Sequence, residues 1–525
     1  MTARTLTLRG ASYPLVLPSI RDPRLHVAAV IISVHILGQL GLGFRVSVPQ
    51  ILAAILTCAI LEVAITFRQS RAFVWPASAM LTGSGVALIL RVVGTRPGDP
   101  WTFDAWYVFA AIAGLSLLSK YVIKYRGSHV FNPSNIGLVV AFVVLGSSRI
   151  EPLDFWWAPL NPWMLAAYAV ITVGGLLITR RLRLLPLAAT FWLGLAAGTG
   201  LLALTGHCMT ANWAFAPVCG ADFWRVIVTS PEVLIFLFFM ITDPKTVPSG
   251  RVGRVVFGLL VAVASVLLMA PQTDEFGTKV GLLAGLVVVC AARPLVDRLV
   301  PEPQAAADEL RAYLASAGPV RGMLPRLAVA LAGLALVGAA VVVAGSPARG
   351  SVAPNVAEVL NRPEPVVDPS TLPPITVEPD VTDFDHELAG DGIRQVVVSL
   401  AQDLELENQA LLRRDPQLLA AINHGDRLEE MQARLADLSS GGSATTLSHY
   451  RFDAIHVSLL IPFGRQTGLS LGLAGTGTVT EESVDPGGAV RSLGERPFEL
   501  TFAMRQATGE RWMIVAVLEP DEVPR

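Results

Sequence analysis

Long apolar runs separated by short polar stretches fill the first 345 residues of the chain. Most runs approach the roughly 20 residues that an α-helix needs to cross a bilayer. The run at 134–148 is shorter than a full span. The pattern predicts about eleven spans, near residues 26–44, 49–68, 73–93, 104–123, 134–148, 162–179, 184–204, 223–242, 252–270, 278–296 and 323–345.

The pattern changes after the last apolar run. A proline-rich stretch at 346–380 predicts an extended linker, and residues 381–525 predict a separate soluble domain. Helical periodicity comes first in that domain, and segments of alternating hydrophobicity follow, the last two forming a hairpin. This order predicts an α+β fold, and it resembles cones of the nuclear-transport-factor-2-like kind.

Composition supports a membrane protein. Of the 525 residues, 52% are hydrophobic and only 16% are charged, which is too apolar for a soluble protein of this length. We therefore expect an all-α polytopic bundle with the lipid bilayer as its main partner. A net charge of -2 gives no reason to expect nucleic acid as a partner.

Lysines and arginines are distributed unevenly between alternate loops. About twenty lie in one set of predicted loops and about six in the other set, a strong positive-inside asymmetry. The chain is therefore expected in the plasma membrane with residues 1–25 as a cytoplasmic tail. Residues 26–303 would form ten spans, 304–345 a cytoplasmic segment and the eleventh span, and the C-terminal domain would be extracytoplasmic.

The four cysteines include no CxxC pair, which argues against a thiolate metal site. Cys208 and Cys219 lie in one polar loop that the charge pattern places on the outer face. A disulfide between them is the expectation in an oxidising compartment, with two reduced thiols as the alternative.

Two carboxylates interrupt apolar runs. Glu62 and Glu232 are candidates for an ion pathway, because an unpaired charge within a membrane is costly. The alternative is that both carboxylates only hold helices together. Pro76 and Pro231 interrupt the third and eighth runs, which predicts two inverted halves of five spans with a site at the midplane.

Two polar clusters stand out at the ends of apolar runs. Residues 119–137 read SKYVIKYRGSHVFNPSNIG, and residues 238–258 read FFMITDPKTVPSGRVGRVVFG. Basic residues beside an Asn-Pro turn could hold a phosphate or an anionic headgroup, and Asn135 could cap a helix. A cationic membrane anchor followed by a turn is the simpler interpretation of the first cluster.

Together the two clusters resemble the paired signatures of the RnfD/NqrB family, over about residues 25–303. These are membrane subunits of the Rnf and sodium-pumping NADH:quinone complexes, and related sequences occur as accessory proteins of enediyne clusters. The resemblance implies a ten-span inverted repeat that carries flavin and passes electrons. It implies cofactor-binding positions at Lys120, Lys124, His129, Phe131, Asn132, Pro133, Asn135, Thr242, Asp243, Pro244, Lys245, Thr246 and Arg251.

The chain departs from the family where FMN is usually attached. No Ser/Thr-Gly-Ala-Thr motif precedes the eighth run, so FMN or riboflavin would be bound non-covalently. The expected function is a membrane subunit for electron transfer or redox-linked ion translocation, working with other membrane subunits. If it is an enzyme, it would be part of an ion-translocating oxidoreductase. The alternatives are a non-redox transporter or channel on the same fold, and a scaffold that presents the outer domain.

Overall fold

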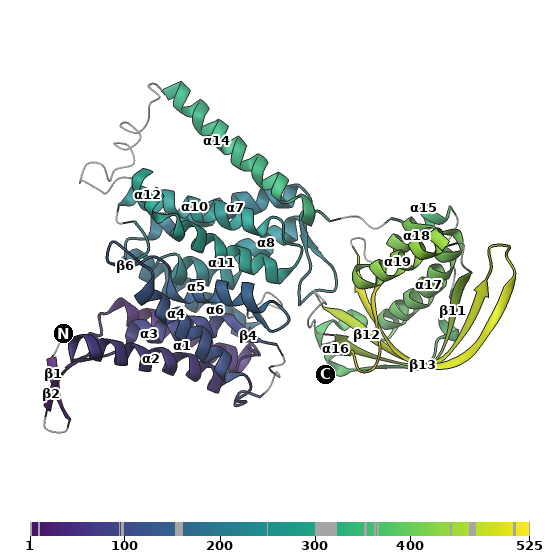
Figure 1. The fold of residues 1–525 in the computed structure, drawn as a ribbon, viewed down its shortest axis with the longest axis horizontal. Coiled ribbons are helices and arrows are strands. Elements are labelled where there is room, and N and C mark those ends of the chain that lie inside the picture. Colours follow the sequence, from purple (N-terminus) through teal and green to yellow (C-terminus); the bar gives the residue numbers. More distant parts are fainter. Residues whose placement is uncertain are drawn as a thin grey trace. The chain divides into compact units, whose positions relative to one another are not determined.

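The chain forms two compact units in a computed structural model (Figure 1). The membrane unit comprises Met1–Met209 and Cys219–Arg349, and the C-terminal unit comprises Thr210–Val218 and Gly350–Arg525. The structure describes residues 3–8, 11–93, 95, 99–152, 161–248, 250–299, 323–350, 354–361, 364, 367–441, 444–460, 469–507 and 511–523.

Helices dominate the membrane unit, where α1 to α11 lie largely side by side (Figure 1). Their bounds are α1 Pro23–Gly41, α2 Val48–Ser70, α3 Ala77–Ile89, α4 Trp106–Val122, α5 Pro133–Leu145, α6 Pro162–Arg181 and α7 Leu185–Leu204. The others are α8 Gly220–Thr229, α9 Pro231–Ile235, the π-helix η1 Phe236–Met240, α10 Arg251–Met269, α11 Glu275–Ala291, α12 Arg293–Leu299, α14 Met323–Ala344 and the 3₁₀ turn η2 Ser346–Ala348.

Among the described residues, seven helices are long and apolar enough to cross a membrane. They are Pro23–Gly41, Val48–Ser70, Pro162–Arg181, Leu185–Leu204, Gly220–Met240, Arg251–Met269 and Leu327–Ala344. Three other predicted runs correspond to the shorter apolar helices α3, α4 and α5, and a fourth to α11, which has 17 residues. The eleven predicted spans are therefore present as helices, but only seven reach full spanning length.

The short helices have local causes. Asn132 caps α5 through its side chain and Pro133 occupies the first turn, so the helix begins at the Asn-Pro step. Ser230 caps α9 in the same way and ends α8 one residue before Pro231. η1 then continues with i→i+5 bonding, since the Ile241 N–H donates to the Phe236 carbonyl.

Small residues allow the helices of the membrane unit to approach closely. α2 packs on α3 and α4, and α10 packs on α7 and α11. A Cβ atom added at Gly83 of α3 would lie 2.4 Å from the Ala54 carbonyl oxygen of α2. One added at Gly258 of α10 would lie 2.7 Å from the Leu187 carbonyl oxygen of α7. Backbone-to-backbone contact of this kind is typical of helix packing in lipid.

Short strands join the helices at their ends. The N-terminal residues, expected as a tail, form an antiparallel hairpin, β1 Ala3–Leu8 and β2 Ala11–Val16, and β2 pairs in parallel with β3 Phe73–Val74. Three two-stranded pairs follow, namely β4 Leu90–Val92 with β7 Ile150–Pro152, β5 Lys124–Tyr125 with β6 Ser128–His129, and β8 Cys208–Met209 with β9 Val218–Cys219. A disulfide joins Cys208 to Cys219.

The C-terminal unit packs helices against one five-stranded sheet, in the order β10-β11-β12-β13-β14. β10 pairs in parallel with β11, and the other neighbours are antiparallel. The strands are β10 Ile375–Val377, β11 Thr445–Leu460, β12 Ser470–Val484, β13 Val490–Gln506 and β14 Trp512–Leu518. The helices are α15 Val356–Leu360, α16 Pro379–Phe384, α17 Asp391–Arg413, α18 Pro416–Ile422 and α19 Gly425–Gly441, with 3₁₀ turns η3 Pro369–Thr371 and η4 His386–Leu388.

Part of the stretch expected as a linker belongs to this unit. Val356 and Leu360 of α15 are buried in an apolar cluster with α17, α18 and α19. β10 lies at the edge of the sheet, and the main core gathers α17 with the inner face of the strands. Phe215, from the loop between Cys208 and Cys219, is also buried in this core. The unit therefore uses residues on both sides of its expected start at 381.

Candidate functional site

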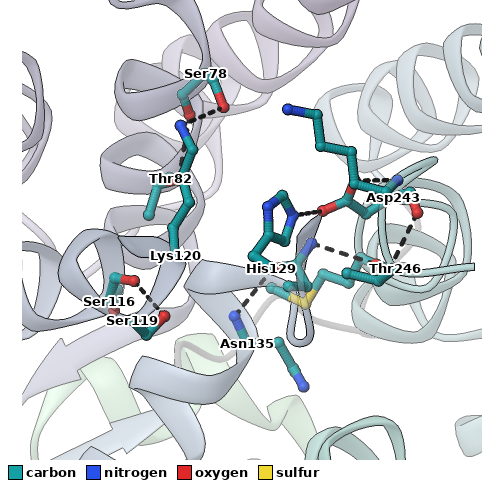
Figure 2. Close-up of polar contacts among 12 residues, drawn as sticks. Ser78, Thr82, Ser116, Ser119, Lys120, His129, Asn135, Asp243 and Thr246 are labelled. Atoms are coloured by element: carbon teal, nitrogen blue, oxygen red, sulfur yellow. Dashed lines mark hydrogen bonds and ion pairs between the residues drawn. The ribbon is translucent and has the colours of Figure 1, made fainter. Parts of the chain in front are cut away.

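The two signature segments meet at one end of the helices. His129, on the β5–β6 hairpin, lies with its Nε2 3.1 Å from Oδ2 of Asp243 (Figure 2). Asn132 donates its side-chain amide to the Met240 carbonyl at 3.3 Å. These contacts join residues more than a hundred positions apart, so the sequence clusters at 119–137 and 238–258 form one structural centre.

Local turn chemistry holds Asp243 in place. Its Oδ1 accepts the Lys245 N–H at 3.1 Å, and the Thr246 hydroxyl donates to its carbonyl. Thr242, buried at the end of the helix, donates its hydroxyl to the Phe238 carbonyl. This self-bonded Thr-Asp-Pro-Lys-Thr turn leaves Oδ2 directed at the imidazole, as Figure 2 shows.

Charges from the next helices surround this turn. The Arg293 guanidinium donates to the Thr246 carbonyl and to Asp297, whose other oxygen lies 3.6 Å from Arg126. Lys245 and Pro244 are exposed, and so is Arg251 at the start of α10. The structure therefore brings His129, Asn132, Asp243 and Thr246 together, and it leaves three other residues of the second signature at the surface.

A second centre surrounds Glu62 of α2. Its Oε1 lies 2.9 Å from the Lys120 ammonium of α4, and the Tyr121 hydroxyl donates to its Oε2. Lys120 also reaches the Ser78 hydroxyl of α3 at 3.4 Å, and Figure 2 shows it directed there. Lys124 lies over the Tyr121 ring. The carboxylate predicted from the sequence is therefore paired, which lowers the cost of its burial.

A third centre contains Glu232, the other predicted carboxylate. The Lys279 ammonium of α11 lies 3.2 Å from Oε1 of Glu232 and 2.7 Å from Oε1 of Glu275. The Ser230 hydroxyl donates to the second oxygen of Glu232. Glu232 and Lys279 line a cavity of about 40 Å³ with Leu88, Pro152 and Leu283, large enough for a water molecule.

Sequence reasoning missed Lys279 and Glu275. It placed Lys279 among the loop charges, although the two residues stand four apart at the start of an apolar run. That spacing puts them on one helix face, and Asp274 immediately before them caps α11. The buried pair of Arg91 with Glu151 was also missed, and it joins β4 to β7 beside Pro152.

The second and third centres lie at opposite ends of α3. Ser78, in its first turn, meets Lys120, whereas Leu88 and Ile89, in its last turn, line the Glu232 cavity. Ten residues of helix separate Ser78 from Leu88, or roughly 15 Å at 1.5 Å per residue. The second and third centres are therefore separated along α3 by less than the thickness of a bilayer core.

Asn135 of α5 contacts residues beside the first and the third centres, since its backbone N–H donates to the Asn132 side chain. It is 1% exposed and donates its side-chain amide to the carbonyl of Leu283, a residue that also lines the Glu232 cavity. Among the described residues, its side-chain oxygen has no hydrogen-bond partner. A buried polar oxygen without a partner is uncommon, and in this position it offers an acceptor to water or a cation between the two signature segments.

Comparisons with known proteins give relatives over part of the chain. It is similar to the D subunit of the ion-translocating oxidoreductase complex of Escherichia fergusonii, with 25% identity over 279 residues, covering 42% of this chain and 75% of that protein. The same protein of Citrobacter koseri gives the same figures, and that of Salmonella arizonae is 24% identical. No family model matches the chain. This similarity and the apolar helices fit a membrane redox protein.

Proposed function

We propose that the chain is a membrane component of a redox complex and that its membrane unit moves a monovalent cation or a proton across the bilayer. The path would run from the Glu232–Lys279 centre past Asn135 to the His129–Asp243 pair. The main support is the unpartnered oxygen of Asn135, which contacts residues beside both of these charged centres. Similarity to proteins of the ion-translocating oxidoreductase complex supports the redox assignment.

The arrangement of short helices supports a path at this position. α3 and α5 are shorter than a bilayer core requires, and the candidate span Gly220–Met240 is interrupted at Ser230 and Pro231. α3, α5 and η1 meet around Asn132 and Asn135. Broken helices of this kind carry ion sites in transporters built from inverted repeats. The matching packing of α2 with α4 and of α7 with α10 supports such a repeat, with α1–α5 and α6–α11 as its halves.

Three residues expected to bind a cofactor, Lys120, His129 and Asn135, are already engaged within the bundle. The Lys120 ammonium lies 2.9 Å from a Glu62 oxygen, so its charge is already neutralised. His129 pairs with Asp243, and the Asn135 side chain is bound within the bundle. We therefore derive no step through FMN or riboflavin from these residues.

The proposed topology follows the charge pattern. We place the protein in the plasma membrane with the N-terminus cytoplasmic and the C-terminal unit extracytoplasmic, where a disulfide between Cys208 and Cys219 is favoured. Other membrane subunits would supply the redox groups. Side-specific labelling of introduced cysteines would test this orientation, and the exposed positions 180 and 417 should label from opposite faces.

The experiment uses membrane vesicles from a strain lacking the gene, complemented with variants of the full chain. Respiration-driven uptake of protons and of sodium is measured with the rate of electron transfer. Wild-type protein should restore both activities. Glu232→Gln should restore electron transfer while lowering cation uptake at least about ten-fold, because a charge that stabilises the cation is removed.

The matched control is Glu405→Gln, which changes an exposed carboxylate of α17. It should restore both activities fully. The proposal is wrong if deletion changes neither activity, or if Glu232→Gln restores uptake to the wild-type rate. If deletion of the gene abolished cation uptake but left the rate of electron transfer unchanged, a transporter without redox chemistry would be favoured.

A further inference from the structure

The C-terminal unit contains a cavity that plays no part in the proposed cation path. It measures about 550 Å³ and lies between residues 370–377, which lead into and form β10, and residues 390–394 at the start of α17. All of these residues belong to the C-terminal unit. Cavities of this size are typical of sites for small molecules.

One side of the cavity is apolar and continuous with the core. Leu372, Ile375 and Val377 pack against the main apolar cluster of the unit, and Ile393, which is 3% exposed, is a member of that cluster. Pro373 and Pro374 extend this wall without adding a backbone donor. An apolar ligand group placed here would be removed from water against the core, which is favourable in proportion to its area.

The lining also carries a positive charge. Among the described residues that line the cavity, Arg394 is the charged one, and its side chain is exposed. It lies in the first turn of the 23-residue helix α17, whose N-cap is Gly390 at φ 58° with no capping side chain. Asp391 is acidic in that turn but is not part of the lining. Ser370 adds a hydroxyl group.

We propose that this cavity binds a single-chain amphiphile with an anionic head, a carboxylate or a phosphate monoester. The alkyl chain would lie against Ile375, Val377 and Ile393, and the head would pair with Arg394. A guanidinium forms strong charge-assisted hydrogen bonds with either head group. The C-terminal unit follows α14, a candidate membrane span, in the sequence. It is therefore tethered to a bilayer, in which single-chain amphiphiles dissolve and from which they could reach the cavity.

The test uses full-length protein in nanodiscs of phosphatidylcholine and three photoreactive probes. The probes share one alkyl chain with a diazirine and differ in the head, which is a carboxylate, a phosphate monoester or an amine. Labelled peptides are identified by mass spectrometry. The carboxylate or phosphate probe should label residues 370–377 and 390–394, and whichever labels more strongly identifies the head. The amine should label them at least about ten-fold less, as expected for a lost ion pair.

Variants separate recognition of the head from general apolar binding. Arg394→Gln should lower labelling by the anionic probes at least about five-fold, whereas Arg394→Lys should keep most of it because the charge remains. Arg413→Gln, in the last turn of the same helix, should change nothing. Pro374→Trp should reduce labelling by all three probes, since the indole would occupy the cavity.

The proposal is overturned if the amine labels as strongly as the anionic probes, if Arg394→Gln has no effect, or if no peptide of the cavity is labelled. Equal melting temperatures of Arg394→Gln and wild type ensure that a loss of labelling reports binding. The assay contains no redox partner and measures no cation uptake, so its outcome is independent of the proposed function.

Discussion

The two carboxylates that interrupt apolar runs of the membrane unit each lie beside a lysine. Glu62 faces Lys120 and Glu232 faces Lys279, each within about one hydrogen-bond length. From the sequence, each carboxylate could be found as a charge in an apolar run, but its partner could not. The partners lie 58 and 47 positions away, and no local pattern connects residues on different helices. The sequence therefore predicted candidates without deciding between a path and a structural pair.

Removing one member of the Glu62–Lys120 pair should destabilise the protein. Lys120→Met leaves Glu62 buried without its cation, which should cost about 3 to 5 kcal/mol. We expect a lower melting temperature in detergent, measured by fluorescence-detected size exclusion. The double variant Glu62→Gln/Lys120→Met should recover most of the loss. Equal melting temperatures for the single and double variants would contradict this.

Asp243 should matter more than an aspartate at the surface of the C-terminal unit. Asp243→Ala removes the partner of His129, which joins the two signature segments, and the acceptor of the Lys245 N–H, which holds the turn of the second segment. Asp385→Ala removes only an exposed bond to the Glu387 N–H. We expect cation uptake in the complemented vesicles to fall at least about ten-fold for Asp243→Ala and to remain for Asp385→Ala. Similar uptake by both variants at equal expression would disprove this.

At the scale of elements, the positions of the helices could be predicted well and their lengths less well. Apolar periodicity placed every helix from α1 to α7 near its run, because a hydrophobic stretch is a strong local signal. α3 ends at β4, whose pairing partner β7 lies on the far side of α4 and α5 in the sequence, and α4 ends at the short hairpin of β5 and β6. The short run at 134–148 did predict a short α5. The hairpin β1–β2 was missed, since six-residue strands leave a weak pattern.

Close helix packing provides a test at this scale. Gly258→Leu should separate α10 from α7, because even a Cβ atom there would lie 2.7 Å from a backbone oxygen. Overpacking of this kind costs about 1 to 3 kcal/mol or more. Gly333→Leu is the matched control, since a Cβ atom on that glycine of α14 has nothing within 4 Å. We expect the melting temperature of the membrane unit to fall for Gly258→Leu alone, and an equal fall in both variants would refute the argument.

At the scale of the whole molecule, the C-terminal unit draws on distant parts of the chain. The sequence predicted its α+β class, since helical periodicity precedes alternating strands in 381–525. It could not predict that Thr210–Val218 belongs to the same unit. Within it, the Leu469 and Gln506 N–H groups donate to the carbonyls of Ala211 and Phe215. Hydrogen bonds between backbone groups of distant segments do not depend on residue type, so the sequence pattern cannot predict them.

A change in that loop should therefore weaken the C-terminal unit. Phe215 is 6% exposed and its ring centre lies 5.1 Å from that of Phe384 and 5.4 Å from that of Trp512. Phe215→Ala should cost about 3 to 5 kcal/mol and make residues 350–525 more sensitive to protease. Phe103→Ala, which removes a ring that is 71% exposed, should not. Equal protease resistance in both variants would exclude a role for the loop in this core.

The stability of the C-terminal unit should also depend on pH through Asp403. Burial raises the pKa of this carboxyl well above its ordinary value of 3.8, although the Arg511 guanidinium, 2.5 Å from Oδ1, opposes the shift. A raised folded pKa means that the contribution of Asp403 to stability is fully present below pH 3.8 and is lost as the pH rises through the folded value. Asp403→Asn, which stays neutral, should abolish this part of the dependence.

The measurement is the melting temperature of the C-terminal unit in the full-length protein, at pH values between about 3.5 and 8. Melting is detected as the temperature at which residues 350–525 become sensitive to protease. Wild type should lose stability with rising pH relative to Asp403→Asn, and the difference should close at the acidic end. Asp453→Asn, at an exposed position on β11, should follow wild type. If wild type and Asp403→Asn ran parallel over the whole range, the pKa of Asp403 would be the same in the folded and the unfolded chain. Its pairing with Arg511 would then offset its burial, and the prediction would be wrong.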